Sequence, residues 1–211
     1  MAVRFPEEEF ARLKKKMFIY EWGRQILLTK LEIIHEDFKN FQSNNPIENI
    51  TSRMKAPESI AGKLQGLAEE LTADNAATYV KDIAGIRVIC TFARDIYTLA
   101  DILRAMPDTK VMSEKDYVSH PKPSGYRGYH FIMEIPVYHT GSIESIPVEV
   151  QLRTAAMDFW ATLEHKVKYK YRDHIPKHLS DELVVCANKI SDLDDRMFMI
   201  QDAISLLNQH N

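Results

Sequence analysis

Several features that mark specialised protein classes are scarce or missing in this sequence. Two cysteines and seven glycines among 211 residues exclude a disulfide scaffold and a collagen-like chain. No stretch approaches the roughly 18 consecutive apolar residues that identify a membrane-spanning helix. Residues 1–16 contain acids and lysines where a secretory signal peptide needs an apolar core. We therefore expect a cytoplasmic protein with no membrane partner.

The cysteines and the charge balance exclude two further kinds of site. Cys90 lies within the apolar run IRVICTF, Cys186 lies far from it, and neither has the C-x-x-C spacing of a zinc site. Both are predicted to be buried, reduced thiols. The net charge of −3 provides no surplus of positive charge, which argues against general binding of duplex nucleic acid.

The residues that are present are typical of a globular protein, with 45% hydrophobic and 27% charged. At roughly 150 residues per domain, the length predicts one compact domain. Apolar residues at helical spacing predict a helix over residues 6–41, in which Gly23 is a candidate break, and another over 179–208. These long flanks exceed what a small sheet can cover. They either pair with each other, pair with another subunit, or fold back on their own domain.

The centre of the chain alternates between strand-like and helix-like segments. Segments rich in β-branched and aromatic residues are the predicted strands, at 84–92, 129–138 and 145–154. A turn at 140–142 joins the last two as a hairpin would, and helices are predicted from about Pro57, over 94–106 and over 155–171. We expect an α/β (α+β) fold, in which a central mixed β-sheet is wrapped by helices and flanked by long helices at both ends.

The predicted strand at 145–154 carries the first candidate site. Its apolar residues point to one face and its polar residues to the other, the polar ones being Glu149, Gln151 and Arg153. Asp82 precedes another predicted strand, and two carboxylates on neighbouring strands can hold one magnesium ion over a sheet. The alternative is an ordinary solvated strand face.

A second candidate site lies in residues 115–130, which read as a loop with proline and glycine turns. This segment mixes cations with tyrosines: Lys115, Lys122 and Arg127 with Tyr117, Tyr126 and Tyr129. Such a loop can bind phosphate with its cations and stack a base on its aromatic rings. The alternative is a lysine-containing loop whose tyrosines only pack against the protein.

A third cluster lies in the segment SRMKAPESIAGK. Arg53 and Lys55 alternate as on an extended strand, and Ser59 and Lys63 fall four residues apart on one helix face. The segment is a candidate phosphate cradle, although it lacks the spacing of a P-loop. Each of the three clusters, taken singly, is also compatible with a solvated face.

Taken in order, these motifs resemble the synthetase domain of the RelA/SpoT family. The set comprises S-R-x-K-x-x-x-S-x-x-x-K, D-I-A-G-I-R, K-D-Y-x-x-x-P-K-P-S-G-Y-R-x-x-H, E-V-Q-L-R-T and A-M-D-F-W-A-T-L-E-H-K. The resemblance implies a nucleotidyltransferase-like sheet and a catalytic domain at 46–172, between helical flanks at 1–45 and 173–211. With no room for the hydrolase or regulatory domains of the long enzymes, the chain resembles a small alarmone synthetase.

The resemblance implies a GTP pyrophosphokinase that moves the β,γ-pyrophosphate of ATP to the 3′-hydroxyl of GTP or GDP, making (p)ppGpp and AMP. By motif position, Asp82 and Glu149 would hold Mg²⁺, and Glu149 would also be the base. The residues matching the ATP side are Arg53, Lys55, Ser59, Lys63 and Arg87. Those matching the GTP or GDP side are Lys115, Lys122, Tyr126, His130, Gln151 and Arg153.

Some positions depart from the pattern of the long enzymes. Ser52 stands where glycine is frequent, Ser124 where asparagine is frequent, and Gly128-Tyr129 where Ser-Leu is common, which leaves the choice among GDP, GTP and GMP open. The chain has no His-Asp dipeptide, so we expect no hydrolase activity. The family's small members also imply a homo-oligomer, a tetramer, held by the flanking helices.

Two other functions stay open at this point. One is a related pyrophosphokinase that acts on an adenine nucleotide or the end of a tRNA, because the sequence shows the guanine side only as Tyr126 and its loop. The other is a non-catalytic nucleotide- or RNA-binding module on the same fold. The pair Asp82 and Glu149 argues against such a module, since a site without chemistry has no need of two carboxylates that tend to be buried together.

Overall fold

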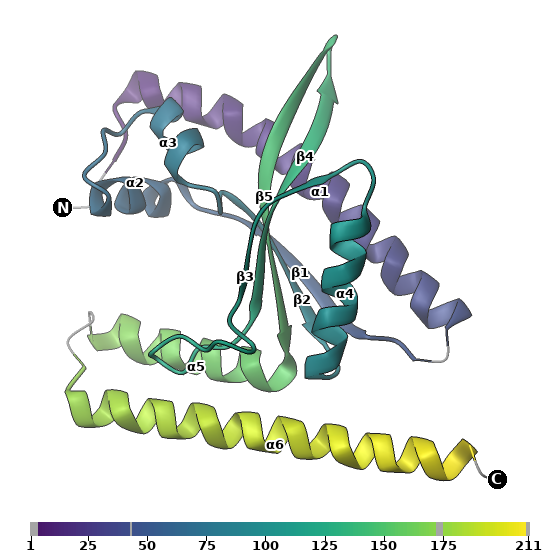
Figure 1. Cartoon of the computed structure of the whole chain (residues 1–211). Helices are drawn as coiled ribbons and strands as arrows, with labels where there is room; N and C mark the ends of the chain where they lie inside the picture. Colours follow the sequence, from purple (N-terminus) through teal and green to yellow (C-terminus); the bar gives the residue numbers. More distant parts are fainter. Residues whose placement is uncertain (1–3, 43, 172–174, 210–211) are drawn as a thin grey trace.

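The computed structural model describes residues 4–42, 44–171 and 175–209, which form a five-stranded mixed sheet with helices around it (Figure 1). The strands are β1 (Ile47–Met54), β2 (Ala84–Cys90), β3 (Lys110–Asp116), β4 (Tyr129–His139) and β5 (Ser142–Thr154). The helices are α1 (Glu7–Phe41), α2 (Pro57–Gly66), α3 (Ala73–Tyr79), α4 (Ala93–Ala105), α5 (Ala155–Tyr171) and α6 (Lys177–Gln209). The predicted α/β architecture with helical flanks is the observed one.

The order of the strands places β5 at the centre of the sheet. The order is β1-β2-β5-β4-β3, with β2 and β5 parallel and every other neighbouring pair antiparallel. Gly85 of β2 pairs with Glu149, and His130 of β4 pairs with Gln151. Side chains alternate along each strand, so these register pairs bring the polar residues of three strands to one face.

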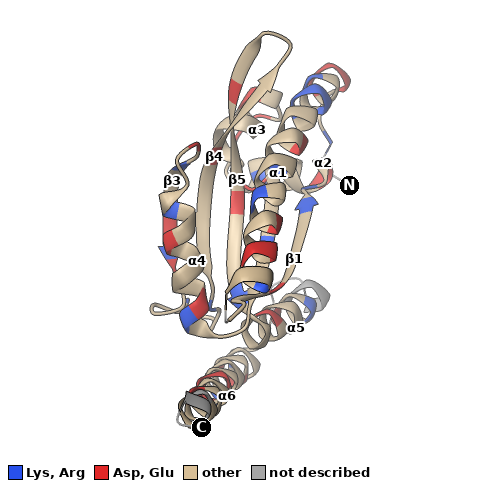
Figure 2. Ribbon diagram, turned by 90° about the vertical axis from the view of Figure 1, so that its right-hand side faces the viewer, with Lys and Arg blue, Asp and Glu red and all other residues tan. Residues whose placement is uncertain are grey.

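The opposite face of the sheet is apolar and is covered by α1 and α4 (Figure 2). Val148, Val150 and Leu152 of β5 are fully buried there, together with Leu27 and Leu31 of α1. The N-terminal flank therefore folds back on its own domain. The buried residues of α1 are covered by the sheet of the same chain and need no other subunit to cover them.

The predicted break at Gly23 is wrong, because α1 continues through this residue without interruption. A Cβ atom at Gly23 would lie 3.1 Å from Cβ of Ile146 and 3.4 Å from Cγ2 of Val137. The glycine allows the helix to approach β4 and β5 closely. Its role is in packing, and the helix tolerates its weak propensity because the surrounding residues are buried.

Three elements differ from the sequence-based expectation. Strand β3 and helix α3 were not predicted, and β1 was recognised only as an extended segment at Arg53 and Lys55. As a result Lys115 lies on β3, whereas the interpretation of residues 115–130 placed it in a loop. Tyr129 also leaves that loop: it is buried on β4, where its ring stacks on Phe131 at 5.0 Å.

Helices α5 and α6 lie beyond one end of the sheet (Figures 1 and 2). The first half of α6 packs on α5, and Trp160 Nε1 donates a hydrogen bond to the carbonyl of Leu183 at 3.1 Å. Another stripe of α6 is exposed and apolar, comprising Leu193, Met197, Ile200, Ile204 and Leu207. The C-terminal flank thus covers part of its own domain and leaves a second apolar face open.

Two further expectations concern the thiols and the membrane. Cys90 is buried as predicted, but Cys186 is exposed on α6, so the predicted burial of the second thiol is wrong. Its neighbour in sequence, Ala187, is buried against the body of the protein. Within the part of the chain that the structure describes, no helix has the length and apolar composition to cross a membrane.

Candidate functional site

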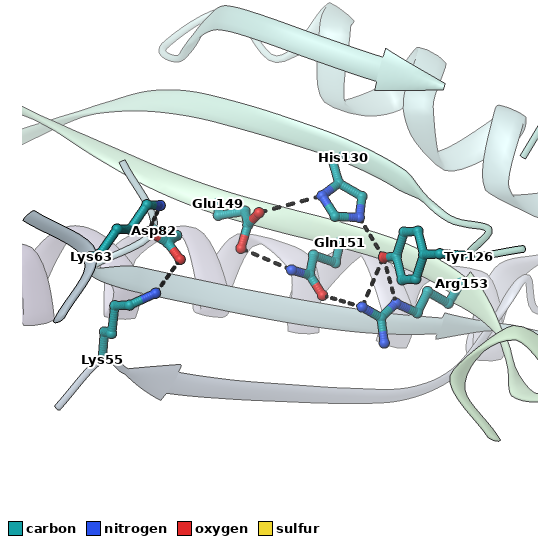
Figure 3. A network of polar contacts seen from close by, with 8 residues as sticks. All are labelled: Lys55, Lys63, Asp82, Tyr126, His130, Glu149, Gln151 and Arg153. Carbon is teal, nitrogen blue, oxygen red and sulfur yellow. Dashed lines mark hydrogen bonds and ion pairs between the residues drawn. The ribbon is translucent and has the colours of Figure 1, made fainter. Parts of the chain in front are cut away.

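The polar face of β5 carries a row of three side chains joined by hydrogen bonds (Figure 3). Gln151 Nε2 donates to Glu149 Oε2 at 2.9 Å, and Arg153 Nη2 donates to Gln151 Oε1 at 2.8 Å. These side chains point the same way because they occupy alternate positions on one strand. The row is therefore a polar site on a central strand, which contradicts the alternative of an ordinary solvated face for Arg153, a buried residue.

Tyr126 and His130 close this row into a ring. The hydroxyl of Tyr126 accepts hydrogen bonds from Arg153 Nε at 3.1 Å and from Nη2 at 2.8 Å, and it lies 2.5 Å from Nε2 of His130. His130 Nδ1 lies 3.4 Å from Oε1 of Glu149. Two chains of contacts therefore join Tyr126 to Glu149, one through His130 and the other through Arg153 and Gln151.

Asp82 forms a second cluster at the start of β2. Its Oδ2 accepts from Lys55 Nζ at 2.5 Å, and its Oδ1 accepts from Lys63 Nζ at 2.7 Å. Lys55 follows β1 and Lys63 lies on α2, so three separate segments meet at one carboxylate. The sequence pattern that suggested a phosphate cradle thus places its two lysines together with the proposed metal carboxylate.

Both carboxylates are held in the ionised form. Burial raises the pKa of Asp82, but the hydrogen bonds and charges of Lys55 and Lys63 outweigh it and lower that pKa from its ordinary value. Burial likewise raises the pKa of Glu149, and the hydrogen bond and charge of His130, with the bond from Gln151, bring it below its ordinary value. The charge of Asp82 opposes this lowering, so the two carboxylates are close enough to interact.

A cleft of about 180 Å³ opens between β1, β2 and β5. Arg53, Arg87, Glu149 and Gln151 line it. Burial is the largest cause that lowers the pKa of the Arg87 guanidinium, and the charges of Arg153 and Arg53 add to it. These guanidinium groups crowd one another, so an anionic or aromatic ligand between them would relieve their repulsion.

Asp158 is part of the site and was not singled out from the sequence. Its Oδ1 accepts from Arg153 Nη1 at 2.9 Å and pairs with Arg87 Nη1 at 3.1 Å. It belongs to the first turn of α5, and the motif A-M-D-F-W contained it. The sequence signal for it is an acid in the first helical turn after a strand that carries an arginine, although the sequence does not fix its contacts.

The loop between β3 and β4 surrounds Tyr126 with aromatic and cationic groups. Lys122 Nζ lies 4.5 Å from the ring centre of Tyr117 and 4.9 Å from that of Tyr126. Arg127, by contrast, is partly buried and donates to the carbonyl of Val118 at 2.9 Å. Lys122 is thus a cation of the loop that faces its rings, whereas Arg127 holds the loop's backbone.

Two glycines let this loop pack closely. Gly125 has φ +87°, and a Cβ atom there would lie 2.6 Å from Cβ of Ala187 on α6. Gly128 has φ +153°, and a Cβ atom there would lie 3.1 Å from the hydroxyl of Tyr126. A side chain at either position would push the loop off α6 or disturb the ring of hydrogen bonds.

Two predicted site residues remain apart from these clusters. Ser59 is exposed on α2, and no side-chain contact connects it with the Asp82 cluster among the described residues. Lys115 is exposed on β3 and pairs in register with His130, which places it at the edge of the same face. Their assignment to the site therefore depends on their motif positions.

The carboxylate oxygens of Asp82 and Glu149 are suited to bind magnesium. Carboxylate oxygens are ligands that Mg²⁺ prefers, and they are supplied by Asp82, just before β2, and by Glu149 on the neighbouring strand β5. Among the residues that the structure describes, no group of three or more His, Cys, Asp or Glu side chains forms a metal site. The two carboxylates therefore fit a magnesium ion whose remaining ligands are water and substrate phosphate.

Comparison with known proteins decides the family. Residues 52–174 match the family described as the region found in RelA / SpoT proteins. The chain belongs to the RelA/SpoT family. It is 40% identical over 191 residues to the GTP pyrophosphokinase YwaC of Bacillus subtilis, and the aligned region covers 90% of this chain and 91% of that protein. It is 34% identical over 185 residues to the GTP pyrophosphokinase YjbM of the same organism, covering 88% and 86%.

Solved structures of this RelA/SpoT family agree. The crystal structure of small alarmone synthetase 1 from Bacillus subtilis, bound to its product pppGpp, has a TM-score of 0.87 at 32% identity and covers 92% of this chain and 99% of that one. Small alarmone synthetase 2 from the same organism has a TM-score of 0.81 at 39% identity, covering 90% and 98%. The resemblance to small alarmone synthetases and the predicted fold class are confirmed.

Within this RelA/SpoT-family chain, the matched region runs from β1 to beyond α5. It contains both clusters described above, from Arg53 to Asp158. Helices α1 and α6 lie outside the match, although both pack against the matched region.

Proposed function

We propose that this protein is a (p)ppGpp synthetase, a GTP pyrophosphokinase that transfers pyrophosphate from ATP to the 3′-hydroxyl of GTP or GDP. The observation that carries the proposal is that two ionised carboxylates, Asp82 and Glu149, share a face with the cations Lys55, Lys63, Arg53 and Arg87. The overall likeness to GTP pyrophosphokinases, over about nine tenths of the chain, supports the same reaction.

In this proposal the β1–β2 side of the polar face serves ATP and the β4 side serves the acceptor nucleotide. Arg53 and Arg87 flank adenine, while Lys55, Ser59 and Lys63 bind the ATP phosphates. Tyr126 stacks on guanine, and the other acceptor-side residues are Lys115, Lys122, His130, Gln151 and Arg153. Glu149 lies between the two groups, which is where the acceptor hydroxyl and the transferred phosphorus must meet.

Glu149 acts as the general base in this scheme. It is ionised at neutral pH, as a base must be, and its hydrogen bonds to His130 and Gln151 fix its direction. It takes the proton of the 3′-hydroxyl as that oxygen attacks the β-phosphorus of ATP. The bond from the β-phosphorus to the oxygen of the α-phosphate breaks, and AMP leaves with that oxygen.

Magnesium is the cofactor we propose, held by Asp82 and Glu149 together with phosphate oxygens. When bound it would neutralise charge on the transferring phosphates. The lysines and arginines of the cleft provide the remaining charge neutralisation. Since transfer of this kind depends mostly on positioning and charge, these groups are sufficient for the chemistry.

The test is the product pattern. ATP is supplied with GTP, GDP, GMP or an adenine nucleotide, and products are separated by anion-exchange chromatography. We expect guanosine products and AMP from the wild-type protein, and no release of pyrophosphate from added (p)ppGpp. Glu149→Gln keeps the size of the side chain and should lower turnover by at least about a hundredfold, the scale of a lost general base.

Two outcomes of this assay contradict the proposal. Products built on the adenine acceptor alone would point to the related pyrophosphokinase. No product with any acceptor, from a folded protein, would point to the non-catalytic module. Near-normal synthesis by folded Glu149→Gln would exclude this residue as the base.

We also propose a cytoplasmic homo-oligomer, a tetramer, in which the exposed stripe of α6 from Leu193 to Leu207 is covered by another subunit. Five apolar side chains of this stripe are between 48% and 68% exposed. They recur in steps of four and three residues, the spacing with which helices pair along a seam. An uncovered face of this kind favours association.

A further inference from the structure

Both oxygens of the Asp82 carboxylate are engaged by lysines (Figure 3). Each of its two oxygens accepts from a different ammonium group, Oδ2 from Lys55 at 2.5 Å and Oδ1 from Lys63 at 2.7 Å. The side chains of Asp82 and Lys55 are only 20% and 17% exposed, so water does little to weaken these contacts. A metal ion that binds this carboxylate must therefore displace a lysine or bind beside its positive charge.

Charge makes that displacement unfavourable for a free cation. Two ammonium groups on one carboxylate leave a local surplus of positive charge, and Arg53 and Arg87 line the adjoining cleft. Glu149 is also engaged, by His130 and Gln151. A divalent ion alone would enter a positive region, lose hydration that it gives up reluctantly, and leave a lysine without its partner.

A metal ion that arrives on a polyphosphate meets a different balance. The phosphate oxygens accept the hydrogen bonds that Lys55 and Lys63 give up, so neither ammonium group is left unpaired. The complex also carries net negative charge into a cleft that has a surplus of positively charged side chains. The same lysines that oppose a free cation therefore favour a metal–nucleotide complex.

We propose that Lys55 and Lys63 make the site specific for the metal–nucleotide complex, by holding Asp82 away from free divalent cations until a polyphosphate takes their place. This inference rests on the proposed function and assigns the lysines a role before substrate binds. The two lysines divide the role. Lys55 is fixed by its backbone, whose N–H bonds the carbonyl of Ile83 at 2.8 Å, whereas Lys63 is 41% exposed on α2 and is the lysine that releases first.

The test measures metal binding, with Mn²⁺ as the probe because it shares the preference for oxygen ligands and is visible by electron paramagnetic resonance. The full-length protein is titrated with Mn²⁺ alone. The titration is then repeated with an ATP analogue that has a methylene bridge between the α- and β-phosphorus atoms and cannot be cleaved there. We expect wild-type protein to bind Mn²⁺ only when the analogue is present.

Lys63→Met and Lys55→Met each free one oxygen of Asp82. We expect each variant to bind Mn²⁺ without nucleotide at least about tenfold more tightly than wild type, a change of one decade in affinity. The gain should vanish in the double variant Lys63→Met/Asp82→Asn. Thermal unfolding confirms that each variant is folded, and the two single variants provide independent tests.

Lys81→Met is the matched control. Lys81 is the neighbour of Asp82 in sequence, but its Nζ donates to the carbonyl of Ala77 at 3.1 Å and does not contact the carboxylate. This variant removes the same charge without opening Asp82, so its affinity for free Mn²⁺ should stay at the wild-type level. An equal gain in Lys81→Met would show that general charge is responsible and would overturn the inference.

Two further outcomes separate this inference from the proposed function. Wild-type protein that binds Mn²⁺ equally well with and without the analogue, yet makes the alarmone, overturns the role of the lysines alone. Wild-type protein that binds no Mn²⁺ under either condition overturns both the metal site and the inference built on it.

Discussion

Tyr126 has two roles, one for its ring and one for its hydroxyl, and substitutions can separate them. Its ring lies 4.9 Å from Lys122 Nζ, and its hydroxyl holds Arg153 and contacts His130. Tyr126→Ala should raise the KM for the guanosine nucleotide about ten- to a hundredfold, since base stacking is worth roughly 1 to 3 kcal/mol, and should leave the KM for ATP unchanged. Steady-state kinetics with each substrate varied in turn measures both constants.

Tyr126→Phe is the matched control for this prediction. It keeps the ring, so the KM for the acceptor should stay near the wild-type value. It removes the hydroxyl that anchors Arg153 and His130, so kcat should fall. If Tyr126→Ala raised the KM for ATP first, the two nucleotide sites would be assigned the wrong way round.

The pH dependence of the reaction should depend on His130. Burial raises the pKa of Glu149, and contact with His130 is the first of the causes that bring it below the ordinary value of 4.5. Because the pKa of Glu149 is lowered in the folded protein, its ionised form stabilises the fold at pH values above the pKa of the unfolded state. This stabilisation is lost as the pH falls through the pKa of the folded state. The acidic limb of the kcat profile in wild type should therefore lie below about pH 4.5.

His130→Ala removes that contact and leaves burial and the charge of Asp82, which both raise the pKa of Glu149. The acidic limb of kcat should move to higher pH, measured over the range in which circular dichroism shows a folded protein. His139→Ala is the control, because His139 makes a similar contact with Glu144, at 3.6 Å, outside the site. An unchanged profile in His130→Ala would remove His130 as the group that controls Glu149.

The residues of the site differ in how far the sequence could predict them. Glu149, Gln151 and Arg153 follow from strict alternation along one strand, which fixes the face of each side chain before the fold is known. Asp158 could not be placed, because its contacts with Arg87 and Arg153 depend on where α5 begins relative to the sheet. The closed ring through His130 depends on the register between β4 and β5 and was also beyond the sequence.

At the scale of elements, the sequence predicted the central strands and the long helices. It did not predict the edge strand β3 or the short helix α3, and it gave the edge strand β1 only as an extended segment. Strands β1 and β3 are the two edges of the sheet, and β3 is mostly exposed, so neither shows a regular alternation of apolar and polar residues. Helix α3 spans only seven residues, which is too short for a helical stripe. The central strands and long helices were predictable because one face of each must be apolar.

Gly23 provides a test of how α1 packs on the sheet. Gly23→Leu places a side chain where even a Cβ atom lies 3.1 Å from Ile146, so overpacking should lower the free energy of unfolding by about 1 to 3 kcal/mol. Denaturant unfolding followed by circular dichroism measures this change. Gly62→Ala is the control: Gly62 lies in α2 with no atom within 4 Å of its Cβ position, so it should gain about 0.5 to 1 kcal/mol.

A loss of stability in Gly23→Leu without a change in helix content supports close packing as the role of this glycine. A stable variant with an unperturbed unfolding midpoint would instead mean that the helix and the sheet separate more easily than the distances indicate. The predicted break at Gly23 failed for the same reason: helix propensity is a local quantity, whereas the approach of two surfaces is not.

At the scale of the whole molecule, α6 packs on the loop between β3 and β4 with one side and is exposed on another. Ala187 packs against Gly125 beside Tyr126, and Asp194 accepts a hydrogen bond from Thr154 at 2.6 Å, at the end of β5. Farther along, the ring of Phe198 lies 5.6 Å from that of Phe92. One side of the helix therefore supports the site, and the apolar stripe beside it is exposed.

The final prediction follows from this division of α6 into two sides. Leu193→Glu combined with Met197→Glu places two carboxylates on the exposed stripe, where burial against another subunit would leave them unpaired. We expect light scattering at micromolar concentration to give an oligomer for wild type and a mass near 24.4 kDa for the double variant. Asn188→Glu, at an exposed polar position of α6, should leave the oligomer intact.

The activity of the double variant then decides what assembly contributes. Both clusters of the site lie between Arg53 and Asp158, and the contacts of Ala187 and Asp194 with the site's surroundings do not involve the stripe. A monomeric variant should therefore keep measurable synthesis. A wild-type mass near 24.4 kDa would contradict the oligomer, and complete loss of synthesis in a folded monomer would mean that a neighbouring subunit completes the site.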